Sequence, residues 1–218
     1  MGGSGRNPFE SPERASSYEQ WYETTGRRAS RLERRLLGHL LDGFGDIASA
    51  LEVGCGTGHF SRWLAGRGPV EVVGADRSLP MLLEARRLGM TGTVAGDGSS
   101  LPFADRVFDL VLLVTVLEFV SDPRAVLREA ARVSRRGLVI GALNRRSGLG
   151  RTIARCPAAP WSSARLMSVG ELGRLVATAV PGRRPEIRWR TTLWPATTWE
   201  VPLPWGGFIG MSARWDAG

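Results

Sequence analysis

The sequence predicts an α/β fold built on a mainly parallel sheet. Residues 51–53 and 71–76 are short apolar segments that carry an acidic residue, and each precedes a stretch in which apolar residues repeat at helical spacing. Residues 110–115 form a continuous apolar run, as expected of a strand buried on both faces of a parallel sheet. A chain of 218 residues, of which 43% are hydrophobic, can form one such unit with a full core.

The N-terminal part of the chain contains a predicted amphipathic helix. Its leucines are Leu32, Leu36, Leu37, Leu40 and Leu41, and its arginines are Arg27, Arg28, Arg31, Arg34 and Arg35. The net charge of +8 leaves nucleic acid open as a partner. However, all 29 basic residues are arginine, a bias that is typical of a GC-rich coding sequence. We therefore interpret the arginines as the solvated face of this helix.

Three glycines follow the first predicted strand at alternate positions. After Gly54, Gly56 and Gly58, the apolar residues of 59–65 repeat at helical spacing, so the turn is expected to open a helix. Glycine lets backbone N–H groups approach a ligand because no Cβ blocks them, and the start of a helix attracts an anionic group. A dinucleotide-binding turn would place its third glycine at the position of His59, so the spacing argues against a dinucleotide.

Two further predicted strands end on acidic residues. Asp76 ends residues 71–76, about 20 residues after the glycine turn, where nucleotide-binding α/β folds contact a ribose. Asp97 and Gly98 end the third predicted strand, residues 93–98. We expect both carboxylates to converge on one ligand with the glycine turn.

Two longer motifs surround the fourth predicted strand. Residues 101–111 read LPFADRVFDLV and residues 117–123 read LEFVSDP. Together with the preceding motifs, over residues 48–143, they resemble the class I S-adenosylmethionine-dependent methyltransferases that act on small molecules. The second motif usually contains a histidine where this chain has Phe119, so a base supplied by that histidine would be missing here.

The resemblance implies a Rossmann-like three-layer sandwich with a mostly parallel seven-stranded sheet and an antiparallel C-terminal hairpin strand. It also implies S-adenosylmethionine as the cofactor, with the glycine turn around the methionine moiety, Asp76 at the ribose, and Asp97 with Gly98 at the adenine. The expected cofactor contacts are Glu52, Gly54, Gly56, Gly58, Asp76, Arg77, Met81, Asp97, Gly98, Thr115 and Glu118.

An aromatic segment precedes the arginine-rich helix. It contains Tyr18, Trp21 and Tyr22, and it resembles a segment that can fold over the cofactor in many members of the family. Aromatic residues beside a polar terminus usually have a binding or packing duty. Two interpretations remain open: a lid over the site, or a plug that packs the helix onto the sheet.

The chemistry implied by the resemblance is an in-line displacement at the sulfonium methyl group. Holding the acceptor atom against the methyl carbon in a dry pocket lowers much of the barrier, and a base is needed only for an acceptor that is protonated at neutral pH. The catalytic residues remain unknown. We interpret His59 and His39 as structural residues, and Glu118 as a contact with the cofactor or the substrate. The acidic, His and Cys residues are too scattered to form a metal site.

The C-terminal third is expected to shape the acceptor site. A helix starts at Pro123 and is closed by residues 135–137, residues 138–143 form a strand, and residues 144–168 form part of a substrate wall. Residues 169–180 are expected to be a helix, and residues 185–190 and 207–214 strands. Five tryptophans gather here, at Trp189, Trp194, Trp199, Trp205 and Trp215; they either pack in the core or, from the loop at 191–204, form an aromatic wall.

The expected organisation is one methyltransferase domain over residues 1–218. Its parts are N-terminal cap or lid helices (1–45), a cofactor-binding core (46–143), and a substrate-side insertion with C-terminal strands (144–218). The expected function is methyl transfer to a small molecule. The alternatives are an RNA methyltransferase that uses the arginine-rich surface, and an S-adenosylmethionine-binding protein without catalysis.

The sequence also carries indications of location. No apolar run is long enough to cross a bilayer, and residues 1–5 lack the apolar core of a signal peptide, so we expect a cytoplasmic protein with no membrane partner. The two cysteines, Cys55 and Cys156, are expected to be free thiols in a reducing compartment. The oligomeric state is left open.

Overall fold

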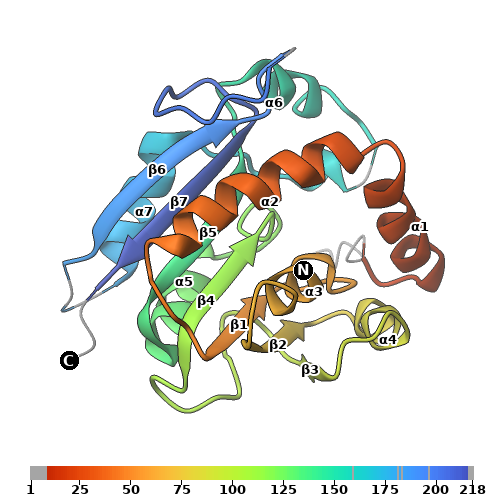
Figure 1. Ribbon diagram of the computed structural model, residues 1–218. Helices are drawn as coiled ribbons and strands as arrows, with labels where there is room; N and C mark the ends of the chain where they lie inside the picture. Colours follow the sequence, from red (N-terminus) through yellow and green to blue (C-terminus); the bar gives the residue numbers. More distant parts are fainter. Residues whose placement is uncertain (1–8, 159, 181, 183, 196, 216–218) are drawn as a thin grey trace, which may run out of the picture.

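A seven-stranded sheet with helices on both faces forms the centre of the molecule, as the computed structural model in Figure 1 shows. The structure describes residues 9–158, 160–180, 182, 184–195 and 197–215, so residues 1–8 of the predicted cap lie outside it. The strands are β1 (Ser49–Val53), β2 (Glu71–Asp76), β3 (Gly92–Ala95), β4 (Phe108–Val114), β5 (Ser134–Leu143), β6 (Glu186–Thr192) and β7 (Phe208–Arg214). The helices are α1 (Pro12–Glu23), α2 (Arg27–Asp42), α3 (His59–Ala65), α4 (Leu79–Arg87), α5 (Pro123–Val133), α6 (Gly148–Ile153) and α7 (Val169–Ala179), with a 3-10 turn η1 (Trp161–Ser163).

The strand order is β3-β2-β1-β4-β5-β7-β6. The first five strands pair in parallel, whereas β7 runs antiparallel to both β5 and β6. The predicted mostly parallel sheet with an antiparallel C-terminal hairpin is therefore confirmed. Since β1 to β4 run in the same direction, their carboxyl ends share one edge of the sheet, and the connections that leave those ends gather there.

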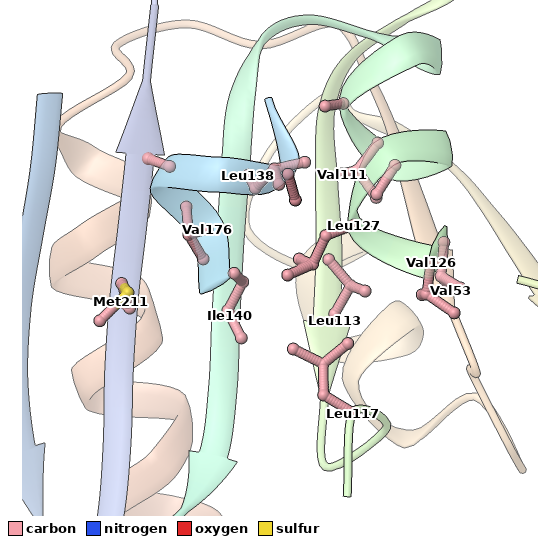
Figure 2. Close-up of a cluster of buried hydrophobic side chains, with 14 of the residues drawn as sticks. Val53, Val111, Leu113, Leu117, Val126, Leu127, Leu138, Ile140, Val176 and Met211 are labelled. Carbon is pink, nitrogen blue, oxygen red and sulfur yellow. The ribbon is translucent and has the colours of Figure 1, made fainter. Parts of the chain in front are cut away.

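Two cores flank the sheet because successive side chains of a strand point to opposite faces. Val111 and Leu113 of β4 enter the core formed with α5 and α7, while the alternate residues Leu110 and Leu112 enter the core beneath α2 and α3. Figure 2 shows the first core, in which Leu127 of α5 lies among these β4 side chains. This alternation explains why the whole run is apolar.

The boundary between α5 and β5 differs from the prediction. Residues 135–137 were expected to close the helix, but α5 ends at Val133 and β5 begins at Ser134. Gly137 lies within the strand at φ 155°, and a Cβ there would lie 2.3 Å from the carbonyl oxygen of Ala213 in β7. A close approach between strands, and not a helix end, accounts for this glycine.

The other predicted elements are present; the strand at 71–76 has the predicted bounds, and most of the others have ends shifted by a few residues. The stretch at 144–168, expected to form part of a substrate wall, contains the short helix α6 and the turn η1. Helix α7 begins with a capping box in which Ser168 and Glu171 satisfy each other's backbone N–H groups. Both cysteines are free thiols. Within the described ranges, none of the helices is both long and apolar enough to cross a membrane.

Candidate functional site

A cavity of about 370 Å³ lies at the carboxyl edge of the sheet. It is lined by the turn after β1, the ends of β2 and β3, the segment after β4, and the N-terminal aromatic residues; among its lining residues are Glu52, Gly54, Gly56, Asp76, Arg77, Met81, Asp97, Gly98 and Thr115. Nine of the eleven residues predicted to contact the cofactor thus line one cavity. Gly58 and Glu118 do not.

The glycine turn is held in place by β2. The backbone N–H groups of Gly54 and Cys55 donate to the carbonyl of Ala75 at 2.7 and 3.1 Å, and the N–H of Gly56 donates to Asp76 Oδ2 at 2.8 Å. Gly54 adopts φ 68°, and a Cβ there would lie 2.5 Å from Val116 Cγ2. The turn therefore needs glycine for both its conformation and its packing.

Gly58 has a structural role at this turn. It precedes α3 at φ 77°, and a Cβ there would lie 2.1 Å from Met90 Sδ. Gly58 is therefore required for the left-handed turn into the helix and for the close approach of Met90. Its predicted contact with the cofactor is corrected accordingly.

Asp76 and Asp97 both line the cavity, as predicted. Asp76 Oδ1 also accepts from the N–H of Ser78 at 2.8 Å, so the carboxylate is fixed by backbone donors, although burial raises its pKa. Asp97 Oδ1 accepts from the N–H and hydroxyl of Ser99 at 2.8 and 2.7 Å, and these bonds lower its pKa. Two oriented carboxylates thus face the same space from neighbouring strand ends.

Glu52 lies at the inner end of the cavity and is almost fully buried. It accepts a hydrogen bond from the hydroxyl of Ser61, but burial raises the pKa of Glu52 to about 8. The side chain is therefore largely protonated at neutral pH. In that form it offers one O–H donor as well as an acceptor.

Glu118 faces away from the cavity. Its Oε1 accepts from the N–H of Leu143 at 2.7 Å, the side chain is 1% exposed, and burial raises its pKa to about 7. Glu118 thereby ties the end of β4 to the end of β5. The predicted contact with cofactor or substrate is corrected by this position.

Two residues of the N-terminal aromatic segment line the cavity, and the third does not. Tyr18 and Tyr22 of α1 line it, and their hydroxyls lie 3.2 Å apart. Burial raises the pKa of Tyr18 to about 12, so this phenol stays protonated. Trp21, which is 40% exposed, lies outside the lining and packs over Gly26. Tyr18 and Tyr22 thus belong to the cavity lining and Trp21 does not, and the lid interpretation stays a prediction.

Glu19, which lies between these aromatic residues in α1, was not predicted from the sequence to contact the glycine turn. Its Oε2 accepts from Thr57 Oγ1 and its Oε1 from Arg62 Nη2, both at 2.6 Å. His59 Nδ1 lies 3.3 Å from the same Oε1. The carboxylate therefore connects α1 to the glycine turn and to α3. An acidic residue within the aromatic segment was the available signal.

His59 is buried between side chains of α1 and α2. Its ring stacks on Tyr22 with centroids 3.7 Å apart, Nδ1 donates to Glu19, and Nε2 accepts from Ser30 Oγ at 2.7 Å and from Arg34. Burial lowers its pKa, so the imidazole is neutral. The expected structural role fits this geometry, whereas Arg34 is turned inward and does not belong to the solvated face.

The aromatic side chains at the cavity are not the tryptophans of the loop at 191–204 that were considered for an aromatic wall. Phe119 lines the cavity and packs against Phe9 and Trp161 at centroid distances of 5.4 and 6.1 Å. Trp199 and Trp205, from the predicted loop, are 63% and 56% exposed and lie outside the lining. That loop is instead held on α2 through Glu200, which pairs with Arg35 and His39.

The cavity suits a cationic nucleoside better than it suits a metal. Asp76 and Asp97 supply carboxylates, Glu52 supplies a carboxyl group that is largely protonated, and Arg77 is the one arginine among the described lining residues. In the part of the chain that the structure describes, no group of three His, Cys, Asp or Glu residues could hold a metal ion. Gly54 and Gly56 carry no side chains, so a ligand can approach the backbone of this turn closely.

Known proteins match this chain in sequence and in fold. A family model for a methyltransferase domain matches residues 51–140. A curated but uncharacterized protein of Methanocaldococcus jannaschii is 34% identical over 140 residues, which are 63% of this chain and 62% of that protein. The malonyl-(acyl-carrier protein) O-methyltransferase of Salmonella typhimurium is 36% identical over 127 residues, 58% of this chain and 48% of that enzyme. The chain thus spans only part of the length of these curated relatives.

A solved structure extends the similarity over nearly the whole chain. It is a protein of Thermotoga maritima described as an S-adenosylmethionine-dependent methyltransferase and possible histamine N-methyltransferase. It shares 28% identity and a TM-score of 0.79, and the match covers 93% of this chain and 96% of that one. The family match across the glycine turn and the common fold show that residues 51–140 form a methyltransferase domain, and that the chain has the fold of an S-adenosylmethionine-dependent methyltransferase.

Proposed function

We propose that this chain transfers the methyl group of S-adenosylmethionine to a small-molecule acceptor. The observation that carries the proposal is the convergence of the glycine turn, Asp76 and Asp97 on one cavity of about 370 Å³. This volume is in the range of cofactor sites. Residues 1–218 would act as one domain, with the predicted division into 1–45, 46–143 and 144–218.

The lining residues divide among the parts of the cofactor. Glu52, Gly54 and Gly56 would hold the methionine moiety, Asp76 with Arg77 the ribose hydroxyls, and Met81, Asp97 and Gly98 the adenine. Asp76 supports this assignment because its carboxylate is already oriented by two backbone donors. When bound, the cofactor supplies an electrophilic methyl group. Thr115, at φ 53° directly after β4, borders the same cavity.

The acceptor would lie against the aromatic wall formed by Phe9 and Phe119, and Trp161 packs against Phe119. Neither His59 nor Tyr18 offers a free base to this wall, because His59 is already hydrogen-bonded at both ring nitrogens and Tyr18 stays protonated. Catalysis would therefore depend on positioning and on exclusion of water. The fitting acceptor carries a lone pair at neutral pH, as a weakly basic nitrogen or an acidic hydroxyl or thiol does.

The alternatives receive less support. An RNA methyltransferase would need arginines around the mouth of this cavity, yet the arginine-rich face belongs to α2 and only Arg77 borders the site within the described residues. The two free thiols are consistent with a reducing compartment, and we propose the cytoplasm.

The direct test is binding of S-adenosylhomocysteine, measured by calorimetry for the wild type and for Asp76→Asn and Asp97→Ala. Loss of a charge-assisted hydrogen bond of about 1.5–3 kcal/mol should weaken binding by roughly 10- to 100-fold in each variant. Asp46→Ala, an exposed position on another face, is the control and should bind as the wild type does. Unchanged affinity in both site variants would remove these residues from the site.

Catalysis is tested separately by the release of S-adenosylhomocysteine in the presence of acceptor panels. Amines, phenols, thiols and a short RNA should be compared at the same salt concentration. Turnover with a small acceptor supports the proposal. Tight cofactor binding with no turnover on any acceptor class would favour the non-catalytic alternative, and turnover with RNA alone would favour the other.

A further inference from the structure

A second cavity, of about 800 Å³, lies between α1, α2 and α3. Tyr22 and His59 line both this groove and the cofactor cavity, so the stacked pair forms a wall between the two. The groove is strongly basic: its arginines are Arg27, Arg31, Arg34, Arg35, Arg62 and Arg67. Neither the methyl transfer nor the cofactor contacts proposed above use this space.

Half of these arginines already have carboxylate partners. Arg35 pairs with Glu200, Arg62 Nη2 lies 2.6 Å from Glu19 Oε1, and Arg67 Nη2 lies 2.6 Å from Asp42 Oδ1. The carboxylates neutralise the charges of these three arginines, whose ion pairs are structural contacts of α1, α2 and the C-terminal loop.

The other three arginines, Arg27, Arg31 and Arg34, have no ion pair among the described residues. Arg27 donates to the backbone carbonyl of Glu23, which does not cancel its charge. The carboxylate of Glu23 is the one remaining acid in the lining, so the groove keeps an excess of two positive charges. A phosphate group carries up to two negative charges at neutral pH.

Arg34 adds an unsatisfied donor to this excess. Its Nη2 donates to His59 Nε2, but its Nε is buried and has no hydrogen-bond partner among the described residues. Buried donors are nearly always satisfied by protein, water or a ligand, and a guanidinium forms its strongest bonds with carboxylate or phosphate oxygens. An anion in the groove would supply the missing acceptor.

The spacing of the three arginines sets the size of that anion. Positions 27, 31 and 34 follow one face of α2, and together they span about 10 Å along the axis. This length suits one phosphate or diphosphate group in a concave site. An RNA strand would need cations along a longer path.

We propose that this groove binds the phosphate or diphosphate group of a small molecule, held by Arg27, Arg31 and Arg34. The helix face that the sequence analysis interpreted as solvated thus becomes a second binding site beside the lid. The proposal concerns binding alone and does not depend on which acceptor is methylated.

The experiment measures pyrophosphate binding by calorimetry at constant ionic strength, with saturating S-adenosylhomocysteine present so that the glycine turn is occupied. We expect one site per chain. Arg31→Glu should weaken binding at least about tenfold, because it replaces one charged donor by a repelling charge. Arg128→Glu is the matched control, since Arg128 is also exposed on a helix, α5, but on the other face of the sheet, and the net charge changes equally. It should bind within about twofold of the wild type.

Other outcomes would overturn the proposal. Equal weakening by Arg31→Glu and Arg128→Glu would indicate diffuse attraction to a basic protein. Pyrophosphate that binds only without S-adenosylhomocysteine would be occupying the cofactor cavity. A 12-nucleotide RNA that binds in an Arg31-dependent way while pyrophosphate does not would identify a nucleic-acid surface instead.

Discussion

The carboxylate of Glu19 joins α1 to the glycine turn and to α3, which directly follows that turn. Burial acts to raise the pKa of Glu19, but hydrogen bonds from His59 and Thr57 and the charge of Arg62 lower it below its usual value. The side chain is therefore ionised at neutral pH and accepts charge-assisted bonds. Because Thr57 lies in the glycine turn and Glu19 in α1, the lid and the cofactor-binding turn are held as one unit.

Glu19→Gln should loosen this connection without changing the shape of the side chain. We expect roughly tenfold weaker binding of S-adenosylhomocysteine, which corresponds to about 1.4 kcal/mol and is typical of a lost bond to a charged group. Calorimetry measures the affinity, and hydrogen exchange of the amides in α1 measures the opening of the lid. Glu23→Gln, on the exposed face of the same helix, is the control. Equal affinities for the two variants would show that the lid closes without this carboxylate.

At the residue scale, local motifs predicted which residues stand at strand ends, but they did not predict side-chain contacts between segments that are distant in the sequence. Asp76 and Asp97 could be placed at the cavity because each stands at a fixed position in a strand-end motif. Glu19 could not be paired with Arg62, 43 residues away, because no local pattern specifies that contact. Glu118 was misplaced because its side chain turns toward the N–H of Leu143 and away from the cavity, a direction that the motif alone does not specify.

The start of β5 shows the same limit at the scale of elements. Two arginines followed by a glycine, at 135–137, are typical of a helix end. In the structure these residues already belong to β5, and Gly137 pairs with Leu110 of β4 and with Arg214 of β7. Pairing with a strand more than 70 residues away decides where β5 begins. The helix and the strand were both predicted, but the predicted boundary between them lies a few residues after the observed one, which falls between Val133 and Ser134.

The glycine turn and α3 lead to a prediction about stability at this scale. Gly58→Ala should destabilise the protein by about 1–3 kcal/mol, because alanine is strained at φ 77° and its Cβ would meet Met90. The midpoint of urea unfolding measures the change. Gly68→Ala is the control, since a Cβ at Gly68 meets nothing within 4 Å and its φ is not positive. A midpoint for Gly58→Ala equal to that of the control would contradict the role given to this turn.

At the scale of the whole molecule, the structure combines a basic surface with an acidic interior. Glu33, Glu52 and Glu118 are all buried, and burial raises their pKa values to about 7, 8 and 7. None of them forms an ion pair within the described residues. The folded chain therefore keeps protons on carboxyl groups that the unfolded chain releases at its ordinary value of 4.5.

Stability should consequently fall as the pH rises from 6.5 to 8. A group whose pKa is raised on folding stabilises the protein below its unfolded pKa, and this contribution is lost as the pH rises through the folded value. His59 has the opposite effect only below its unfolded value of 6.5, and the lowered pKa values of Glu19 and Asp97 matter only below about 4.5.

The fall in the free energy of unfolding over that interval should be on the order of 2 kcal/mol, since each unit of pKa shift corresponds to about 1.4 kcal/mol and Glu52 titrates latest. Urea unfolding at pH 6.5, 7.25 and 8 measures it. Glu52→Gln keeps the hydrogen-bonding partner of Ser61 but cannot ionise, so its unfolding free energy should depend less on pH than that of the wild type. Glu13→Gln, on the exposed face of α1, should leave the slope unchanged. A wild type whose stability stays level or rises between pH 6.5 and 8 would mean that these carboxyl groups are ionised inside the fold, and that the interior is better solvated than their burial implies.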